Sequence, residues 1–321
     1  MKLPVLSVYP ELPADRDRWI LARRPDRESL DPRRPYAFFV EEECSKDGTV
    51  LPVSTVFLTN RECPWRCVMC DLWRNTLTED VPLGAIPTQI DYALARLSKA
   101  RQIKLYNAGS FFDRRAIPME DFPAIADRVN SFERVIVESH PALIGESSLR
   151  FRDLLKAPLE VAMGLETVHP EILPRLNKRM SLPQFADAAD FLRNHEMDLR
   201  VFVLVKPPFM AEEEAFDWAA RSIDFAFDCG ATAVTLIPTR GGNGAMDDLA
   251  GNGEFSPPSM ATLERAFVYG LGLERGRVFV DLWNMHPNES CPHCYNRRVE
   301  RLQAMNLRQI ILPPAPCRAC H

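Results

Sequence analysis

Residues 57–73 read Phe-Leu-Thr-Asn-Arg-Glu-Cys-Pro-Trp-Arg-Cys-Val-Met-Cys-Asp-Leu-Trp, and they hold three cysteines in the order C-x3-C-x2-C. These are Cys63, Cys67 and Cys70, directly after an apolar run that predicts a strand. Iron–sulfur clusters prefer soft sulfur ligands and normally take four cysteines, so three thiolates hold three irons of a [4Fe–4S] cluster and leave one iron open. The alternative is a zinc site, although zinc knuckles usually pair two C-x2-C units. We therefore predict a three-cysteine cluster site here.

The composition is that of a globular protein with one large core. The chain has 321 residues, 46% hydrophobic and 26% charged, and this length favours a single α/β barrel-like domain with an appendage. A net charge of -5 argues against binding nucleic acid over the whole surface, but leaves a local basic patch open. No apolar run reaches the length of a membrane span and no signal-peptide pattern is seen, so we expect a cytoplasmic protein whose nine cysteines are reduced.

Short apolar runs alternate with longer segments of helical period from residue 53 onward. The expected strands are 53–59, 102–107, 134–138, 159–165, 199–205 and 232–238. The expected helices are 88–99, a segment that begins at Pro118, 143–156, 182–195, 212–228 and 258–271. Six strand–helix units imply an α/β fold with a parallel sheet and right-handed crossovers. They form a partial (βα)6 barrel, because eight units close a full one.

Three regions are expected along the chain: an N-terminal extension over 1–52, a core barrel over 53–272 and a C-terminal metal-binding module over 273–321. The extension interleaves seven arginines with acidic residues. Such mixing is typical of a solvated surface, and the alternative is that these arginines hold a phosphate-bearing substrate. Two cysteines lie outside the groups with metal-ligand spacing. We expect Cys44 to be a free thiol and Cys229 to be a small, buried apolar residue.

The cysteine triplet and the residues that follow the predicted strands resemble the radical S-adenosylmethionine (radical SAM) superfamily, whose motif is C-x3-C-x-Φ-C. Position Φ is Met69, where the family usually has an aromatic residue that touches the adenine. The stretches Tyr-Asn-Ala-Gly-Ser-Phe-Phe-Asp, Gly-Leu-Glu-Thr and Leu-Val-Lys-Pro-Pro-Phe are similar to the subgroup of the archaeosine synthase radical subunit and relatives of the elongator catalytic subunit. The resemblance covers about residues 53–240. It implies that S-adenosylmethionine chelates the open iron.

Cofactor-binding residues are expected where the strands end, because chemistry in parallel barrels gathers there. Asn107, Ala108, Gly109 and Ser110 stand where the family has a Gly-Gly-Glu-like turn that binds the cofactor's amino group. An ordinary βα turn is the alternative. Glu166 ends an apolar strand, where an unpaired carboxylate is costly. The resemblance gives it a contact with the ribose or methionyl part of the cofactor, and the alternative is a salt bridge.

Two further residues at strand ends are candidate catalytic residues. His140 follows the third predicted strand and Lys206 follows the fifth, so both are expected to face the cavity. The alternatives are a structural histidine and a lysine whose buried stem carries its ammonium to solvent. The segment 239–255 contains five glycines and is expected to be a substrate lid or a plain connector.

The C-terminal region carries a second cysteine group. Cys291, Cys294, Cys317 and Cys320 give C-x2-C-x22-C-x2-C, the paired spacing of a four-sulfur site. Zinc is the first choice, and a second [4Fe–4S] cluster is the alternative because both suit this spacing. A helix is expected between the pairs, with four arginines on it: Arg297, Arg298, Arg301 and Arg308. This helix either binds RNA or closes the open side of the barrel.

The expected function is an enzyme that reductively cleaves S-adenosylmethionine and abstracts hydrogen from a substrate. By resemblance, the substrate is a tRNA nucleoside or a small nitrogenous metabolite. The alternatives are a radical SAM enzyme that acts on a protein or peptide, and a non-catalytic, metal-stapled protein that binds RNA or a partner. The radical chemistry requires an electron donor such as flavodoxin or ferredoxin, and tRNA is a candidate partner; no membrane partner is expected.

Overall fold

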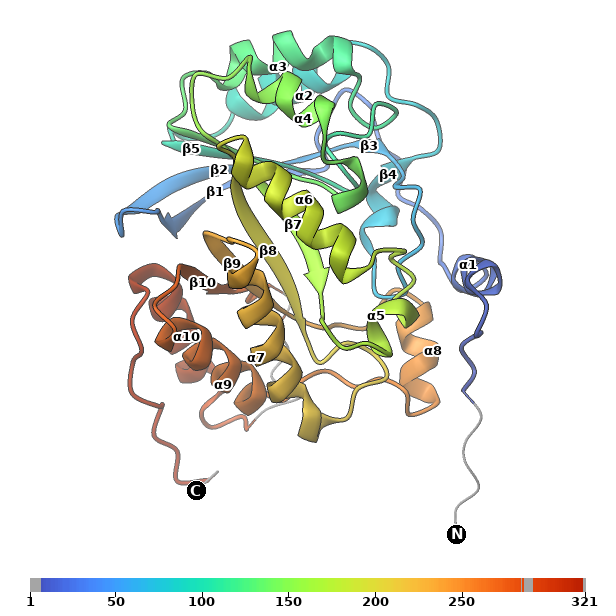
Figure 1. The fold of residues 1–321 in the computed structure, drawn as a ribbon, viewed down its shortest axis with the longest axis vertical. Coiled ribbons are helices and arrows are strands. Elements are labelled where there is room, and N and C mark those ends of the chain that lie inside the picture. Colours follow the sequence, from blue (N-terminus) through green and yellow to red (C-terminus); the bar gives the residue numbers. More distant parts are fainter. Residues whose placement is uncertain (1–6, 284, 286–290, 320–321) are drawn as a thin grey trace.

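A computed structural model describes residues 7–283, 285 and 291–319. Its centre is an eight-stranded sheet, whose strands from edge to edge are β1 (Ala37–Cys44), β2 (Val50–Leu58), β5 (Gln102–Asn107), β6 (Arg134–Glu138), β7 (Leu159–Glu166), β8 (Asp198–Val205), β9 (Ala233–Pro238) and β10 (Arg277–Val280). β1 runs antiparallel to β2, and all later neighbours are parallel. The sheet curls around a lumen (Figure 1), so the predicted partial barrel is confirmed.

All six predicted strands are present, and the first begins three residues earlier than expected, at Val50. Two strands of the sheet were not predicted. β1 carries three successive glutamates, which hide its apolar pattern, and β10 has only four residues. The two edges of the sheet were therefore missed, while its centre was found. A separate two-stranded pair, β3 (Asn60–Arg61) and β4 (Thr76–Leu77), flanks the loop that contains the first three cysteines.

Helices cover the outside of the sheet and the carboxyl ends of its strands (Figure 1). They are α1 (Pro13–Leu21), α2 (Ala85–Leu94), α3 (Phe122–Val129), α4 (Glu146–Arg152), α5 (Ile172–Arg175), α6 (Leu182–Asn194), α7 (Glu212–Asp228), α8 (Ala245–Gly251), α9 (Met260–Gly272) and α10 (Tyr295–Arg308). Short 3-10 turns are η1 (Leu72–Asn75), η2 (Met119–Asp121) and η3 (Pro141–Leu143). None of the described helices is long and apolar enough to cross a membrane.

Local capping explains where the helices begin. α6 starts after Ser181, whose hydroxyl accepts a hydrogen bond from Gln184 N, and α9 starts after Ser259, which does the same for Thr262. Two expected helices differ from the prediction. The segment 88–99 is helical over Ala85–Leu94, after Gly84 in the left-handed region, and 143–156 is helical only over Glu146–Arg152, after Gly145.

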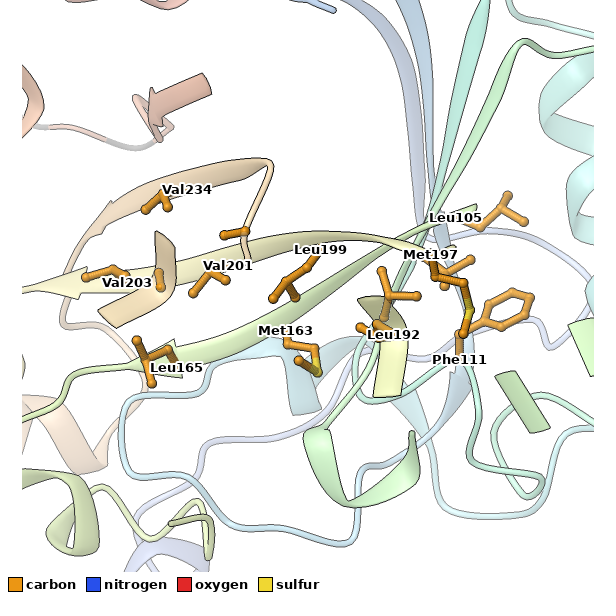
Figure 2. Close-up of a cluster of buried hydrophobic side chains, with 14 of the residues drawn as sticks. Leu105, Phe111, Met163, Leu165, Leu192, Met197, Leu199, Val201, Val203 and Val234 are labelled. Carbon is orange, nitrogen blue, oxygen red and sulfur yellow. The ribbon is translucent and has the colours of Figure 1, made fainter. Parts of the chain in front are cut away.

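Apolar side chains fill the space between the sheet and its outer helices. Figure 2 shows part of this cluster, in which Phe111 and Met197 come from loops and the other labelled side chains come from strands and α6: Leu105, Met163, Leu165, Leu192, Leu199, Val201, Val203 and Val234. All are buried. Parallel strands under helices are covered, so they read as nearly continuous apolar runs, and this is why they could be predicted.

Charged side chains, in contrast, face the lumen near the amino ends of the strands. Glu43 of β1 contacts Lys104 of β5 at 2.6 Å and Arg200 of β8 at 2.6 Å. Arg200 also contacts Glu160 of β7 at 2.6 Å, and Arg277 of β10 reaches Glu160 at 3.1 Å. Glu43, Lys104 and Arg200 line the large cavity of the molecule. We call these five residues the lumen network; it joins the two edge strands across the barrel.

The electrostatics show that the lumen network is charged in the folded protein. Burial by itself raises the pKa of Glu43, but Arg200 and Lys104 outweigh burial and bring this pKa well below its usual range. For Glu160, burial is likewise outweighed, chiefly by Arg200 and Arg277, and the pKa is lowered to about 2. Removing one partner of such a buried pair typically costs about 3–5 kcal/mol, because it leaves the other charge unpaired.

α10 packs against β1 and β10, the two edges of the sheet. The side-chain amides of Asn306, on this helix, and of Gln309, the residue that follows it, take the place of a neighbouring strand. Gln309 accepts from Val278 N and donates to Val278 O, both at 2.8 Å, and Asn306 accepts from Val280 N at 2.8 Å and donates to Val280 O at 2.9 Å. An exposed strand edge invites pairing with other chains, and here the helix covers it.

The predicted helix between the tail cysteines is therefore present, and two of its arginines bind the barrel. Arg298 pairs with Glu264 of α9 at 2.8 Å, and Arg301 reaches the same carboxylate at 3.4 Å. Arg297 and Arg308 are exposed. The helix covers the open side of the barrel, as one of the two expectations had it, and RNA binding by this helix stays a prediction.

We expect Gln309→Ala to weaken the edge of the sheet. The change removes both partners of Val278, so the free energy of unfolding should fall by about 1–3 kcal/mol and the Val278 amide should exchange faster with solvent. Denaturant unfolding and hydrogen exchange measure these effects. Gln303→Ala, at an exposed position of the same helix, is the matched control. Equal exchange at Val278 in both variants would contradict this account.

Candidate active site and metal centre

The loop after β2, residues 62–71, carries the three cysteines and is called the cysteine loop. Cys63, Cys67 and Cys70 all line a cavity of about 1190 Å³ that extends from this loop into the lumen. Burial raises the pKa of Cys63 to about 11 and that of Cys70 to about 12, and it also raises the pKa of Cys67 well above its usual value. A metal that binds these sulfurs therefore has to displace their protons.

Side-chain amides from two distant segments hold the cysteine loop by its backbone. Asn243 donates to Val68 O at 2.8 Å and to Cys70 O at 3.1 Å, while its oxygen accepts from Met246 N. Asn177 donates to Arg66 O at 2.7 Å. Asn243 lies in the glycine-containing segment that was expected to be a lid or a connector. That segment instead contains α8 and an anchor for the cysteine loop.

The N-terminal extension also binds this loop. Arg24 pairs with Glu62 at 2.6 Å, and Arg27 contacts the other oxygen of the same carboxylate. Arg16 donates to the carbonyl of Pro174, at the end of α5, at 2.7 Å. Neither a solvated surface nor a phosphate site describes these three arginines, because each is engaged with protein groups around the cluster site.

His140 packs its ring flat on Trp65 of the cysteine loop, with ring centroids 3.7 Å apart and planes 11° apart. Its Nδ1 accepts from Ala142 N, so Nε2 carries the proton and donates to Lys178 O at 3.1 Å. Burial, with the nearby Lys178 charge, lowers the pKa of His140 to about 3. Both ring nitrogens are thus occupied by backbone groups in a neutral imidazole. The catalytic role predicted for His140 stays a prediction.

The turn after β5 lies beside the cysteine loop. Ala108 N donates to Asn60 at 3.1 Å, and a β-carbon at Gly109 would lie 3.3 Å from the Cys63 β-carbon, so glycine permits this close approach. Ser110 accepts from His140 N at 2.8 Å. Ala108 and Gly109 line the cavity; the Asn107 side chain is buried without a hydrogen-bond partner and is not among the lining residues.

Glu166 has a partner that the sequence did not reveal. Its carboxylate contacts the Lys178 ammonium at 2.5 Å, and both residues line the cavity. A β-carbon at Gly164 would overlap both charged groups, so the pair depends on glycine there. Lys178 also lies close enough to Cys63 and Cys67 to favour their thiolates. The salt bridge that was the alternative for Glu166 is therefore present, and a cofactor contact stays a prediction.

Of the other two predicted site residues, Met69 lines the cavity and Lys206 does not. Met69 lines the cavity beside Cys67. Lys206 is buried, and its ammonium contacts Glu212 at 2.9 Å and Ser256 at 2.7 Å. Lys206 is not among the lining residues, so the structure turns it toward α7 and the segment before α9. Its catalytic role stays a prediction.

The tail forms a compact ligand group. Among the residues that the structure describes, Cys291, Cys294 and Cys317 are the one set of three or more candidate ligand atoms within 4.8 Å of one another. Cys291 Sγ and Cys317 Sγ are 3.9 Å apart. Two thiolates on one tetrahedral zinc, at about 2.3 Å each, lie about 3.8 Å apart. The observed sulfur–sulfur distance therefore suits a single ion. Cys320, predicted as the fourth ligand, lies outside the described residues.

Three residues of the site were missed by sequence reasoning: Glu138 and Lys178, which line the cavity, and Asn243, which holds the cysteine loop. Glu138 ends β6 as Glu166 ends β7, so the same signal, a carboxylate after an apolar strand, was available for it. Lys178 and Asn243 lie in loops far along the chain, and no local pattern connects them to the cysteines.

The fold is similar to that of solved structures. No family model matches the chain. Among solved structures, the chain aligns with archaeal Elp3 from Methanocaldococcus infernus (TM-score 0.50, 14% identity, 69% of this chain and 58% of that one) and with methylornithine synthase (TM-score 0.50, 12% identity, 70% and 64%). The chain has the radical SAM fold.

Curated relatives agree with the expected subgroup. The chain is 26% identical to archaeosine synthase subunit beta of Methanosarcina acetivorans, over 66% of this chain and 65% of that protein. It is 24% identical to an uncharacterized protein of Methanocaldococcus jannaschii, over 72% and 68%. The chain thus spans about two thirds of the length of these relatives. The predicted resemblance is confirmed.

We expect the tail to hold one zinc ion. Changing Cys291 and Cys317 to Ser should release this zinc and unfold α10, since a segment this short depends on metal for its folding energy, while the iron bound at the cysteine loop should stay. Metal analysis of anaerobically reconstituted protein and proteolysis of the tail measure both effects. Cys44→Ser with Cys229→Ser is the control. About eight irons and no zinc per chain would contradict this assignment.

Proposed function

We propose that this protein is a radical SAM enzyme that binds a [4Fe–4S] cluster through Cys63, Cys67 and Cys70. One observation carries the proposal: three cysteines of one loop all line a large cavity in a protein with the radical SAM fold. The non-catalytic alternative has no comparable support, because a binding protein needs no three-thiolate site open to such a cavity.

The residues at this site fit the cluster and its cofactor. Three soft sulfur ligands suit three irons. Gly109 leaves room where a side chain would press on Cys63, and the Lys178 ammonium offsets part of the negative charge of the thiolates. A cluster held by Cys63, Cys67 and Cys70 would supply the electron for reductive cleavage of S-adenosylmethionine, the chemistry by which the substrate would lose a hydrogen atom.

The chain itself positions and shields this chemistry. Asn243 and Asn177 fix the backbone of the cysteine loop, and Trp65 is held on the neutral His140 ring. The paired Glu166 and Lys178 present charge to the cavity, and Gly164 leaves the space that this pair fills. A site built this way keeps the cluster ligands in place beside the cavity, which favours a productive geometry of the reacting groups.

We propose a modified nucleoside of tRNA as the substrate class, supported by the relatives named archaeosine synthase subunit beta. A small nitrogenous metabolite and a peptide are the other classes. The proposed partners are S-adenosylmethionine and a reduced flavodoxin or ferredoxin as the electron donor, and we propose zinc in the tail as a structural metal.

Changing Cys63, Cys67 and Cys70 together to Ala should remove about four irons per chain and abolish 5′-deoxyadenosine formation under reducing, oxygen-free conditions. The physical reason is that no other described cysteine lines the cavity. Iron analysis and chromatography of the products measure this. The Cys44 and Cys229 double variant is the control. Retained cleavage in the triple variant would sink the proposal.

The substrate class is tested in cells. Nucleosides digested from total tRNA should lack one modified nucleoside, and accumulate its precursor, both in cells without this protein and in cells that carry only the triple cysteine variant. Mass spectrometry measures the two species. Unchanged tRNA nucleosides, together with a changed small metabolite or peptide, would contradict a tRNA substrate and would indicate that the substrate belongs to one of the other two classes.

A further inference from the structure

A row of aromatic side chains lines the cavity where the sheet is open, and the proposed chemistry does not use it. Phe39 of β1, Phe57 of β2, Tyr106 of β5, Phe202 of β8 and Trp283, which follows β10, all line the cavity. We call these five residues the aromatic wall. Neighbouring rings are in contact, with centroids 6.2 Å apart for Phe202 and Tyr106 and 6.1 Å apart for Tyr106 and Phe57. Trp283 lies 6.0 Å from Phe57 and 4.9 Å from Phe39, so the wall crosses the gap between the two edge strands.

The alternation of side chains along the strands explains why these rings face the lumen. Residues two apart lie on the same face of a strand. Tyr106 follows Lys104 by two residues and Phe202 follows Arg200 by two, and both charged residues belong to the lumen network. Phe57 is the direct partner of Tyr106 in the register of β2 and β5. The aromatic wall is therefore the next layer of the lumen, toward the carboxyl ends of the parallel strands.

Trp283 is held in place although its ring is uncovered. Its backbone N donates to Asp281 at 2.9 Å, its carbonyl accepts from Arg240, and Arg240 pairs with Asp281. Trp283 is nevertheless 49% exposed, and the other four residues of the wall are only partly buried. A single exposed aromatic residue is ordinary, but adjacent uncovered rings in one cavity mark a binding surface.

The rings of the wall leave their faces open. The planes of Trp283 and Phe39 meet at 42° and those of Phe57 and Trp283 at 54°. The other two contacts are edge-on, at 67° and 88°. None of these four contacts is a parallel stack, so no ring of the wall covers the face of the next one. A further planar ring can stack there.

Two hydroxyl groups lie beside the wall. Tyr36 packs on Phe57 with ring centroids 5.5 Å apart and lines the same cavity as Tyr106. Within the part of the chain that the structure describes, neither tyrosine hydroxyl has a hydrogen-bond partner, and neither is among the fully enclosed polar atoms that lack one. Burial raises the pKa of Tyr106 to about 12 and also raises that of Tyr36, so both hydroxyls keep their protons. They are free to donate to a ligand in the cavity.

We propose that the aromatic wall binds the planar ring of the substrate, a nucleobase that has been turned out of its RNA stack. This inference rests on the proposed function and narrows its substrate class. Enzymes that act on a base take it out of the stack into a pocket, where aromatic side chains stack on its faces and polar groups bind its edge. Tyr36 lies near enough to Cys70 for their charges to interact, so a ring on the wall is close to the proposed cluster site. An aliphatic amine has no flat face for such a surface.

The test measures which compounds the cavity retains. Cluster-loaded protein, saturated with S-adenosylmethionine and without reductant, is dialysed anaerobically against the nucleosides digested from total tRNA of cells that lack this protein, and separately against ornithine as an aliphatic amine. Mass spectrometry measures each compound on both sides of the membrane. We expect the wild type to enrich one nucleoside and not to enrich ornithine. Trp283→Leu, which keeps an apolar side chain but no ring, should lower the affinity for that nucleoside about 5- to 150-fold, the scale of one base stack.

Three further variants separate the parts of the site. Trp218→Leu is the matched control, because Trp218 lies on α7, is partly buried and is not among the residues that line the cavity. Its retention of the nucleoside should match that of wild type. Phe57→Leu should weaken binding as Trp283→Leu does. Tyr106→Phe keeps the ring and removes the hydroxyl, so it should weaken binding less, by about 2- to 10-fold. Equal iron content in all variants shows that each one is folded.

The failures can be told apart. Equal retention of the nucleoside by wild type, Trp283→Leu and Phe57→Leu would overturn the role of the aromatic wall. A wild type that enriches no nucleoside, whether or not it retains ornithine, would overturn the nucleobase as the occupant. Both results leave the proposed function standing when the wild type forms 5′-deoxyadenosine under reducing conditions. A wild type that forms none would overturn the proposed function, and this inference with it.

Discussion

The lumen network is the interaction on which the rest of the barrel depends. A partial barrel has two free edges, and β1 and β10 have no strand between them to close the gap. Glu43 and Arg277 come from these edges and meet Glu160 and Arg200 across the lumen. Buried ion pairs gain little net stability over an apolar core, but they impose one geometry, because any other arrangement leaves a charge unpaired.

The tail covers the two edge strands that the lumen network joins. α10 lies on both edges, and the amides of Asn306 and Gln309 satisfy the backbone of β10 as a further strand would. Asn306 and Leu307 of this helix also belong to the cavity wall. Metal at the tail cysteines would thus hold in place a helix that covers the sheet and encloses the site, so that a small module serves both fold and cavity.

The cluster site is assembled from segments far apart in the chain. Arg24 precedes the sheet, Asn177 follows α5 and Asn243 precedes α8, yet all three hold the cysteine loop or its neighbour Glu62. Each contact leaves the sulfurs free and fixes the backbone that carries them. Lys178, from a further loop, pairs with Glu166 at the wall of the same cavity.

The sequence by itself determined the centre of the sheet and the cysteine loop, because apolar runs and ligand spacing are local patterns. Six strands and most helices could be read from it. It did not predict β1, because its glutamates are typical of a solvated segment and their partners Lys104 and Arg200 lie on distant strands. It also did not predict β10, a short strand whose outer backbone groups bind side chains of the tail. Partners such as Lys178 for Glu166 were decided by the tertiary structure alone, since only folding brings charges from separate loops together in an enclosed space.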